Sequence, residues 1–242
     1  MEALLKLTKA CEASEVHPTT YCSLVGGLWY LVHTWPDIAF AVGYVSRYME
    51  RPREDHMAAV KHILRYIAGT VEFGLVFPRH GNKELHLVGF SDSDLGVDVD
   101  DRKSTTGIIF FLDDMPVEWQ SQKQKVVALS SCEVEYIAGA GAACQTVWLT
   151  RLLKDVTGEA PQAPRLKMDN MSAIALSKNP VLHDRSKHID TKYHFIRECV
   201  DKGDLLLEFA SSQEQLADLM TKALGRSRFC ELREKIGVVN LG

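Results

Sequence analysis

The sequence predicts an α/β protein in which helices flank a mixed five-stranded sheet and a helical segment precedes the sheet. Two observations predict this class. Apolar residues recur at helical spacing before residue 77, whereas three strand patterns follow one another after residue 84. Helices then alternate with single strands. A run of antiparallel strands followed by alternating β and α units indicates a mixed sheet covered by helices.

The segment at residues 20–70 is predicted to be helical. Within residues 54–70, apolar positions recur at helical spacing until Gly69 ends the pattern. Residues 23–50 suit two packed helices with a break before Pro36, because a proline disfavours helix in the residue that precedes it. This segment shows no cluster of residues that would indicate chemistry.

A change of composition at residues 77–84 separates the two patterned regions. Proline, glycine and charged residues gather there and interrupt both patterns. We therefore expect a helical segment at residues 1–80, an α/β domain at residues 81–226 and a C-terminal helix or tail at residues 227–242.

Three strands are predicted directly after this boundary. Residues 85–94 alternate at first and then become polar, which suits a strand whose end lies at a site. Residues 106–114 and 116–123 suit a hairpin that turns at residues 113–115, with Pro116 at the start of the second strand.

A long helix is predicted next, from Ser130 or Ser131 to about residue 156. Either serine is a suitable N-cap, acidic residues occupy the first turn, and Gly158 is a suitable end. Helices and strands then alternate, at residues 165–169 (strand), 170–178 (helix), 188–203 (helix), 204–210 (strand) and 214–224 (helix).

The composition excludes some classes of protein. The hydrophobic fraction of 46% and charged fraction of 25% are those of an ordinary globular chain. The formal net charge of −4 does not indicate a nucleic-acid binder, although a local basic patch would matter more than the sum. None of the six cysteines forms a C-x-x-C pair, which argues against a zinc knuckle.

The sequence also predicts where the chain resides. No apolar run reaches the roughly 20 residues that span a membrane, and the first residues do not resemble a signal peptide. We expect a protein that does not associate with membranes and is not secreted. Its expected location is the cytoplasm, including a virus-like particle, or the nucleus.

Four acidic residues stand at the predicted ends of elements, where a fixed backbone can aim a side chain: Asp92, Glu133, Asp169 and Asp218. Hydrolysis of a phosphodiester by two metal ions needs several carboxylates that converge on one pocket. Magnesium prefers such oxygen ligands. Each acid could instead be a helix cap, a turn residue or a solvated side chain, and spacing alone does not show that they converge.

Seven sequence motifs occur together in one order: GFSDSD, DDRKSTTG, VEWQSQKQ, VALSSCEVEYIA, MDNMSAI, KHIDTKYHFIRE and LADLMTK. In their order and spacing, residues 85–224 resemble the ribonuclease H domain of copia-type retrotransposons, particularly those of plants. Residues 17–70 resemble the segment before that domain, at the end of the reverse transcriptase. The resemblance implies a ribonuclease H-like fold.

The resemblance also implies a function. The chain is expected to cut the RNA strand of an RNA–DNA hybrid, leaving 3′-hydroxyl and 5′-phosphate ends. Two Mg²⁺ ions, or Mn²⁺, would be held by Asp92, Glu133, Asp169 and Asp218. Asp94 is a secondary possibility. Glu135 lies about 200° around the helix from Glu133, so only one of the two can face the pocket, and the resemblance selects Glu133.

Residues that would hold the substrate are expected in two places. The candidates are Arg102, Lys103, Ser104 and Thr105, with Asn170 directly after Asp169. Solvated turn residues are an equally good interpretation of the first four. Such contacts would recognise phosphates and the shape of the hybrid rather than its sequence.

Two other functions remain open. The chain could be a catalytically silent module that binds nucleic acid, or it could support a polymerase, with the reverse transcriptase of the same element as a partner. A metal site at His188, Asp190 and His194 is a further alternative, but polar residues of a helix are the preferred interpretation there.

Overall fold

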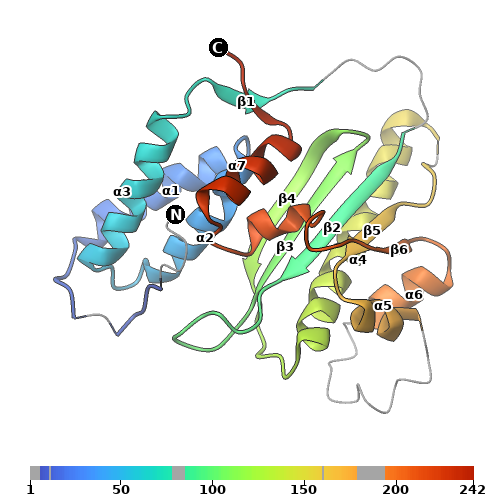
Figure 1. The fold of residues 1–242 in the computed structure, drawn as a ribbon, viewed down its shortest axis with the longest axis horizontal. Helices are drawn as coiled ribbons and strands as arrows, with labels where there is room; N and C mark the ends of the chain where they lie inside the picture. Colours follow the sequence, from blue (N-terminus) through green and yellow to red (C-terminus); the bar gives the residue numbers. More distant parts are fainter. Residues whose placement is uncertain (1–5, 11, 78–84, 160, 179–193) are drawn as a thin grey trace.

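Five strands form one mixed sheet at the centre of the molecule (Figure 1). The computed structural model describes residues 6–10, 12–77, 85–159, 161–178 and 194–242. The strand order is β4-β3-β2-β5-β6. Strands β2, β3 and β4 are antiparallel neighbours, whereas β2, β5 and β6 run parallel. The predicted mixed five-stranded sheet is confirmed, with the bounds β2 Leu87–Ser93, β3 Thr105–Leu112, β4 Met115–Lys123, β5 Arg165–Met168 and β6 Leu206–Phe209.

The hairpin between β3 and β4 turns as its sequence predicts. Asp113 adopts the left-handed conformation, with φ 55°, and its carboxylate accepts a hydrogen bond from the backbone of His86. Pro116 lies near the start of β4, which is an edge strand of the sheet. An edge strand tolerates a proline because one row of its backbone groups needs no partner in the sheet.

Three helices cover one face of the sheet: α4 (Ser131–Thr157), α5 (Met171–Lys178) and α6 (Phe195–Asp201). The hydroxyl of Ser130 accepts a hydrogen bond from the backbone of Glu133 and caps the start of α4. Gly158 ends α4 in the left-handed conformation, with φ 78°. Both ends of the long helix therefore lie where the sequence predicts them.

The opposite face is covered by the N-terminal helices and by the C-terminal part of the chain (Figure 1). Ile109 and Phe111 of β3 pack there with Tyr21 and Val25, while the alternate side chains of β3 pack under α4. This core therefore spans the expected boundary near residue 80, and residues 78–84 themselves lie outside the described part of the chain. Its elements are α1 (Pro18–Val32), η1 (Pro36–Ile38), α2 (Ala39–Val45), η2 (Ser46–Tyr48), α3 (Glu54–Ala68), η5 (Leu216–Met220) and α7 (Arg226–Lys235).

The C-terminal elements differ from those that the sequence predicts. The expected helix at residues 214–224 is only the five-residue 3₁₀ helix η5. A short strand, β7 (Val238–Asn240), pairs antiparallel with β1 (Phe73–Leu75) and joins the C-terminal segment to the segment that follows α3. Three-residue strands are too short to show a periodic pattern, so the sequence did not indicate this pair.

A buried ion pair joins the N-terminal helices to the sheet. Asp98 accepts hydrogen bonds from Arg47 of η2, at 3.0 Å, and from Lys123 of β4, at 2.6 Å. Burial acts to raise the pKa of Asp98, but Lys123 and the backbone donors of Asp100 and Asp101 outweigh it and lower the pKa to about 2. In the part of the chain that the structure describes, no helix is both long and apolar enough to cross a membrane.

Candidate active site

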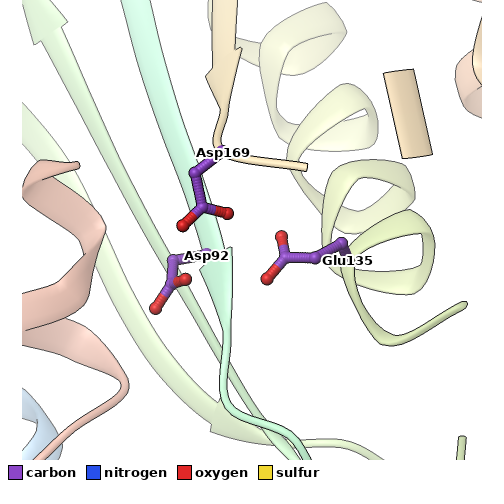
Figure 2. A group of neighbouring side chains, drawn as sticks. All are labelled: Asp92, Glu135 and Asp169. Carbon is purple, nitrogen blue, oxygen red and sulfur yellow. The ribbon is translucent and has the colours of Figure 1, made fainter. Parts of the chain in front are cut away.

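Three carboxylates from separate elements meet at one edge of the sheet (Figure 2). Asp92 belongs to β2, Asp169 follows β5 directly, and Glu135 belongs to α4. One oxygen of each lies within 4.8 Å of the others. The three side chains point toward a common space (Figure 2).

The register of the parallel strands explains why Asp92 and Asp169 meet. Strand β2 pairs with β5 from Val88 opposite Arg165 to Phe90 opposite Lys167. Continuing this register by two residues places Asp92 opposite Asp169. Pairing stops before that point, so the two carboxylates lie where the carboxyl ends of parallel strands separate. Such ends are common places for ligand sites in α/β sheets.

The structure places Glu135 of α4, rather than Glu133, beside Asp92 and Asp169. Glu133 does not join the cluster, because its carboxylate accepts a hydrogen bond of 2.7 Å from the backbone of Leu129, before the helix. Glu135 faces the cluster instead and accepts a hydrogen bond of 2.9 Å from the backbone of Ser93. The sequence carried a signal for this arrangement, since Ser130 and Glu133 have the S-x-x-E spacing of a capping box.

Glu135 is the most perturbed acid of the cluster. Burial first, and then the charges of Asp92 and Asp169, raise its pKa to about 9. Its Oε2 atom is buried and has no hydrogen-bond partner. An unpaired oxygen of a buried carboxylate is costly unless a cation or a proton satisfies it.

Asp218 lies beside this cluster and is joined to it by Lys222. The ammonium group of Lys222 is 2.5 Å from Oδ1 of Asp218 and 3.3 Å from Oδ2 of Asp92. Thr221 also donates a hydrogen bond to Asp92. Asp218, which the sequence also singles out, therefore lies near Asp92, on a 3₁₀ turn rather than on the expected helix.

Two residues hold η5 against the sheet at this place. The side chain of Gln215 donates to the backbone carbonyl of Ser91 on β2, and its own oxygen accepts from the backbone of Ala217. Gly107 of β3 lies directly under η5, because a Cβ atom at that position would stand 2.7 Å from Cβ of Met220 and 2.8 Å from the carbonyl oxygen of Ala217. Absence of a side chain at Gly107 therefore allows η5 to approach Asp92.

The carboxylates repel one another, and this repulsion appears in their pKa values. Burial, followed by the charge of Asp92, raises the pKa of Asp169 and also that of Asp218. Burial acts to lower the pKa of Lys222, but Asp92 and Asp218 raise it above the ordinary lysine value. The site therefore concentrates negative charge that Lys222 partly neutralises.

A divalent cation would fit these residues. The donors are all carboxylate oxygens, which are the ligands that Mg²⁺ prefers. Glu135 contributes a buried oxygen without a partner, and Asp92, Asp169 and Glu135 each present an oxygen to the same space. An ion held there would offset the repulsion that raises the pKa values of Glu135 and Asp169.

The expected substrate contacts are placed differently. Arg102 is exposed, with φ 59°, and Lys103 lies 3.8 Å from Asp101. Ser104 and Thr105 are buried, and a contact between them and a substrate stays a prediction. The hydroxyl of Ser104 accepts from the backbone of Gly96, and that of Thr105 accepts from Arg47.

Asn170, the remaining expected contact, has a structural partner. Its side-chain oxygen accepts a hydrogen bond of 3.0 Å from the backbone of Ala173 and caps α5. This cap fixes the turn that directly follows Asp169. A contact between its amide group and a substrate stays a prediction.

The secondary candidates lie outside the cluster. Asp94 is buried after the end of β2, near Thr105, and burial raises its pKa. The ring of His194 shares a hydrogen bond of 2.8 Å with the hydroxyl of Tyr136. His188 and Asp190 lie outside the described residues, so the alternative metal site there stays untested.

Comparisons with known proteins identify similar chains. The chain is 42% identical over 236 residues to the retrovirus-related Pol polyprotein from transposon RE2 of Arabidopsis thaliana, a match that covers 98% of the chain and 16% of that relative. It is 42% identical over 228 residues to the Pol polyprotein from transposon TNT 1-94 of Nicotiana tabacum, covering 94% of the chain and 17% of that relative. The chain thus spans less than a fifth of these relatives.

Among solved structures, the chain is similar to the N-terminal RNase H domain of Rv2228c from Mycobacterium tuberculosis, determined as a fusion with maltose binding protein. The TM-score is 0.40 and the sequence identity 11%, and the match covers 62% of this chain and 97% of that one. No family model matches the chain.

Proposed function

Because the chain belongs to the Pol polyproteins of copia-type retrotransposons, we propose that it is their ribonuclease H segment, which hydrolyses the RNA strand of an RNA–DNA hybrid. The observation that carries this proposal is the meeting of Asp92, Glu135 and Asp169 within 4.8 Å of one another. These acids are far apart in the sequence, and the fold brings them to one place.

Four side chains would hold the metal ions. Asp92, Glu135 and Asp169 supply converging oxygens, and Asp218 supplies a further carboxylate from η5. A pair of Mg²⁺ ions would supply activation of the attacking water and stabilisation of the departing 3′ oxygen. Mn²⁺ offers the same preference for oxygen ligands.

The protein scaffold fixes the positions of these groups before substrate arrives. The backbone of Ser93 orients Glu135, and Thr221 orients Asp92. Gln215 ties the start of η5 to β2 and so sets the position of Asp218. Ligands held by such secondary contacts lose less order when ions bind, which favours both affinity and catalysis.

A cleavage assay with matched variants tests the proposal. Labelled RNA–DNA hybrid is incubated with the wild-type chain and Mg²⁺, and then with Asp169→Asn, Glu135→Gln and Glu133→Gln. Loss of outer-shell partners costs about 10- to 100-fold in activity or metal affinity, so loss of a direct ligand should cost at least about 100-fold. We expect that loss for Asp169→Asn and Glu135→Gln.

Glu133→Gln is the matched control, because it makes the same chemical change two residues earlier on the same helix. Glutamine can still accept the hydrogen bond from Leu129, so we expect cleavage near the wild-type rate. Loss of cleavage in Glu133→Gln with retention in Glu135→Gln would contradict the assignment. Binding of hybrid without cleavage by the wild-type chain would instead support a catalytically silent module.

A further inference from the structure

We propose that Lys222 is an internal cation that competes with divalent metal ions for the carboxylate site, so that binding of an ion requires its ammonium group to leave. This inference rests on the proposed function, because it concerns the same cluster. The four acids favour metal binding, and Lys222 would be a residue that opposes it.

The position of the ammonium group supports this role. Nζ of Lys222 lies 2.5 Å from Asp218 and 3.3 Å from Asp92, and so bridges two of the four acids. Asp92 is 1% exposed at its side chain and Asp218 11%, so neither carboxylate has ready access to bulk water. A buried carboxylate needs a nearby positive charge, and Lys222 provides it.

The surrounding charges leave no equivalent substitute. Arg228 is 3.9 Å from the other oxygen of Asp218, which is longer than a strong charge-assisted hydrogen bond. No ion pair or hydrogen bond joins Asp92 to any other cation in the described part of the chain. A divalent ion at Asp92 and Asp218 would therefore have to replace the contacts of Lys222.

Lys222 also has a route by which to leave. Its side chain is 41% exposed, unlike the carboxylates that it bridges. A lysine carries its compact charge on a flexible four-carbon side chain, so the ammonium group can withdraw toward water without movement of the backbone. The acids, in contrast, are fixed by Ser93, Thr221 and the ends of strands.

Calorimetric titration of the metal-free chain with Mg²⁺ tests the competition without any measurement of activity. Lys222→Met removes the ammonium group but keeps most of the length of the side chain. Coupling between two binding events usually changes affinity by about 5- to 150-fold, so we expect Lys222→Met to bind Mg²⁺ at least about fivefold more tightly than wild type. Lys222→Arg should retain weak binding, because it keeps the charge.

Lys202→Met is the matched control for net charge. Lys202, at the end of α6, is 65% exposed, and its ion pair in the described part of the chain is with Glu198, which is not one of the four acids. The Mg²⁺ affinity of this variant should therefore equal that of wild type. Equal or weaker Mg²⁺ binding by folded Lys222→Met would overturn the inference. Absence of Mg²⁺ binding in both wild type and Lys222→Met would overturn the proposed metal site as well, so the two failures are distinguishable.

A second measurement uses the wild-type chain and does not depend on the folding of a variant. Lysines are acetylated with N-acetoxysuccinimide, and the modified peptides are quantified by mass spectrometry. We expect Mg²⁺ to increase the rate at Lys222, compared with NaCl of equal ionic strength, and to leave the rate at Lys202 unchanged. An unchanged rate at Lys222 under conditions where Mg²⁺ binds would overturn the inference.

Discussion

Gly107 is the cross-strand partner of Asp92, and η5 packs directly against its α-carbon. Asp92 is a candidate metal ligand on β2, and its partner on β3 has no side chain. Only a glycine at this position leaves room for η5, which brings Asp218 and Lys222 to Asp92.

Substitution of Gly107 by alanine should therefore displace η5. The added Cβ atom would stand 2.6 Å from Cγ2 of Thr221 and 2.8 Å from the carbonyl oxygen of Ala217. Overpacking of this kind costs about 1–3 kcal/mol. We expect that loss in the free energy of unfolding, measured with urea, together with weaker binding of Mg²⁺.

The matched control is Gly141→Ala on α4. Its added Cβ atom would meet only Ile108, at an ordinary contact distance of 3.8 Å. Alanine is favoured over glycine inside a helix by about 0.5–1 kcal/mol, so Gly141→Ala should leave stability unchanged or raise it. If both variants lost equal stability, the close approach at Gly107 would not be the cause.

The N-cap of α4 leads to a second prediction. Ser130 accepts a hydrogen bond of 3.2 Å from the backbone of Glu133. Loss of such a cap usually costs about 1 kcal/mol, and we expect this decrease in the free energy of unfolding for Ser130→Ala. Ser131→Ala removes the neighbouring hydroxyl, which makes no cap, and should change stability by less. The two serines are both exposed, so the comparison isolates the cap from burial. An equal loss of stability in both variants would argue against the N-cap of Ser130 as the cause.

The buried ion pair at Asp98 leads to a prediction about the stability of the fold at low pH. The pKa of Asp98 in the folded chain, about 2, lies below its ordinary value of 3.8, so the folded state holds its proton less tightly than the unfolded state. The stabilisation is complete above about pH 4 and is lost as the pH falls toward 2. Asp98→Asn should thus be less stable than wild type at neutral pH, by about 2 kcal/mol from this linkage alone.

The pH dependence of the difference is the decisive measurement. Because Asp98→Asn has no titrating group at this position, the gap in unfolding free energy should narrow between pH 4 and pH 2. A remaining gap is expected, since Arg47 keeps its buried charge without its partner. Asp114→Asn, in the exposed hairpin turn, is the control and should follow wild type throughout. A gap that stays constant down to pH 2 would show that Asp98 does not stabilise the fold through its charge.

The sequence predicted the elements whose signals are local. Ser130 and Gly158 mark the ends of α4, and Asp113 marks the hairpin turn, because caps and turns depend on residues that are neighbours in the chain. Asp92 and Asp169 could also be identified from the sequence, since each lies at the end of a predicted strand. Their meeting depends only on the order of parallel strands.

The features that the sequence did not reveal depend on distant contacts. Glu133 and Glu135 are both on α4, and a rotation around the helix decides which faces β2; the hydrogen bond from Ser93 shows it. Lys222 reads as an ordinary charged residue until η5 is placed over Gly107. From the sequence alone Ser104 is interpreted as a turn residue, and only the folded loop shows that it is buried.

The core that crosses the expected boundary near residue 80 leads to the last prediction. Ile109 is fully buried against the N-terminal helices, whereas its neighbour Ile108 is buried under α4. Truncation of a buried isoleucine to alanine costs about 2–5 kcal/mol, and we expect this loss for both Ile109→Ala and Ile108→Ala.

If the N-terminal helices fold together with the sheet, each variant should lower the urea midpoint of the whole chain. Tryptophan fluorescence, to which Trp35 and Trp119 on the N-terminal side contribute, and circular dichroism, to which α4 contributes, should then give coincident transitions. Two separate transitions, with Ile109→Ala shifting only one, would show instead that the N-terminal helices unfold independently of the sheet.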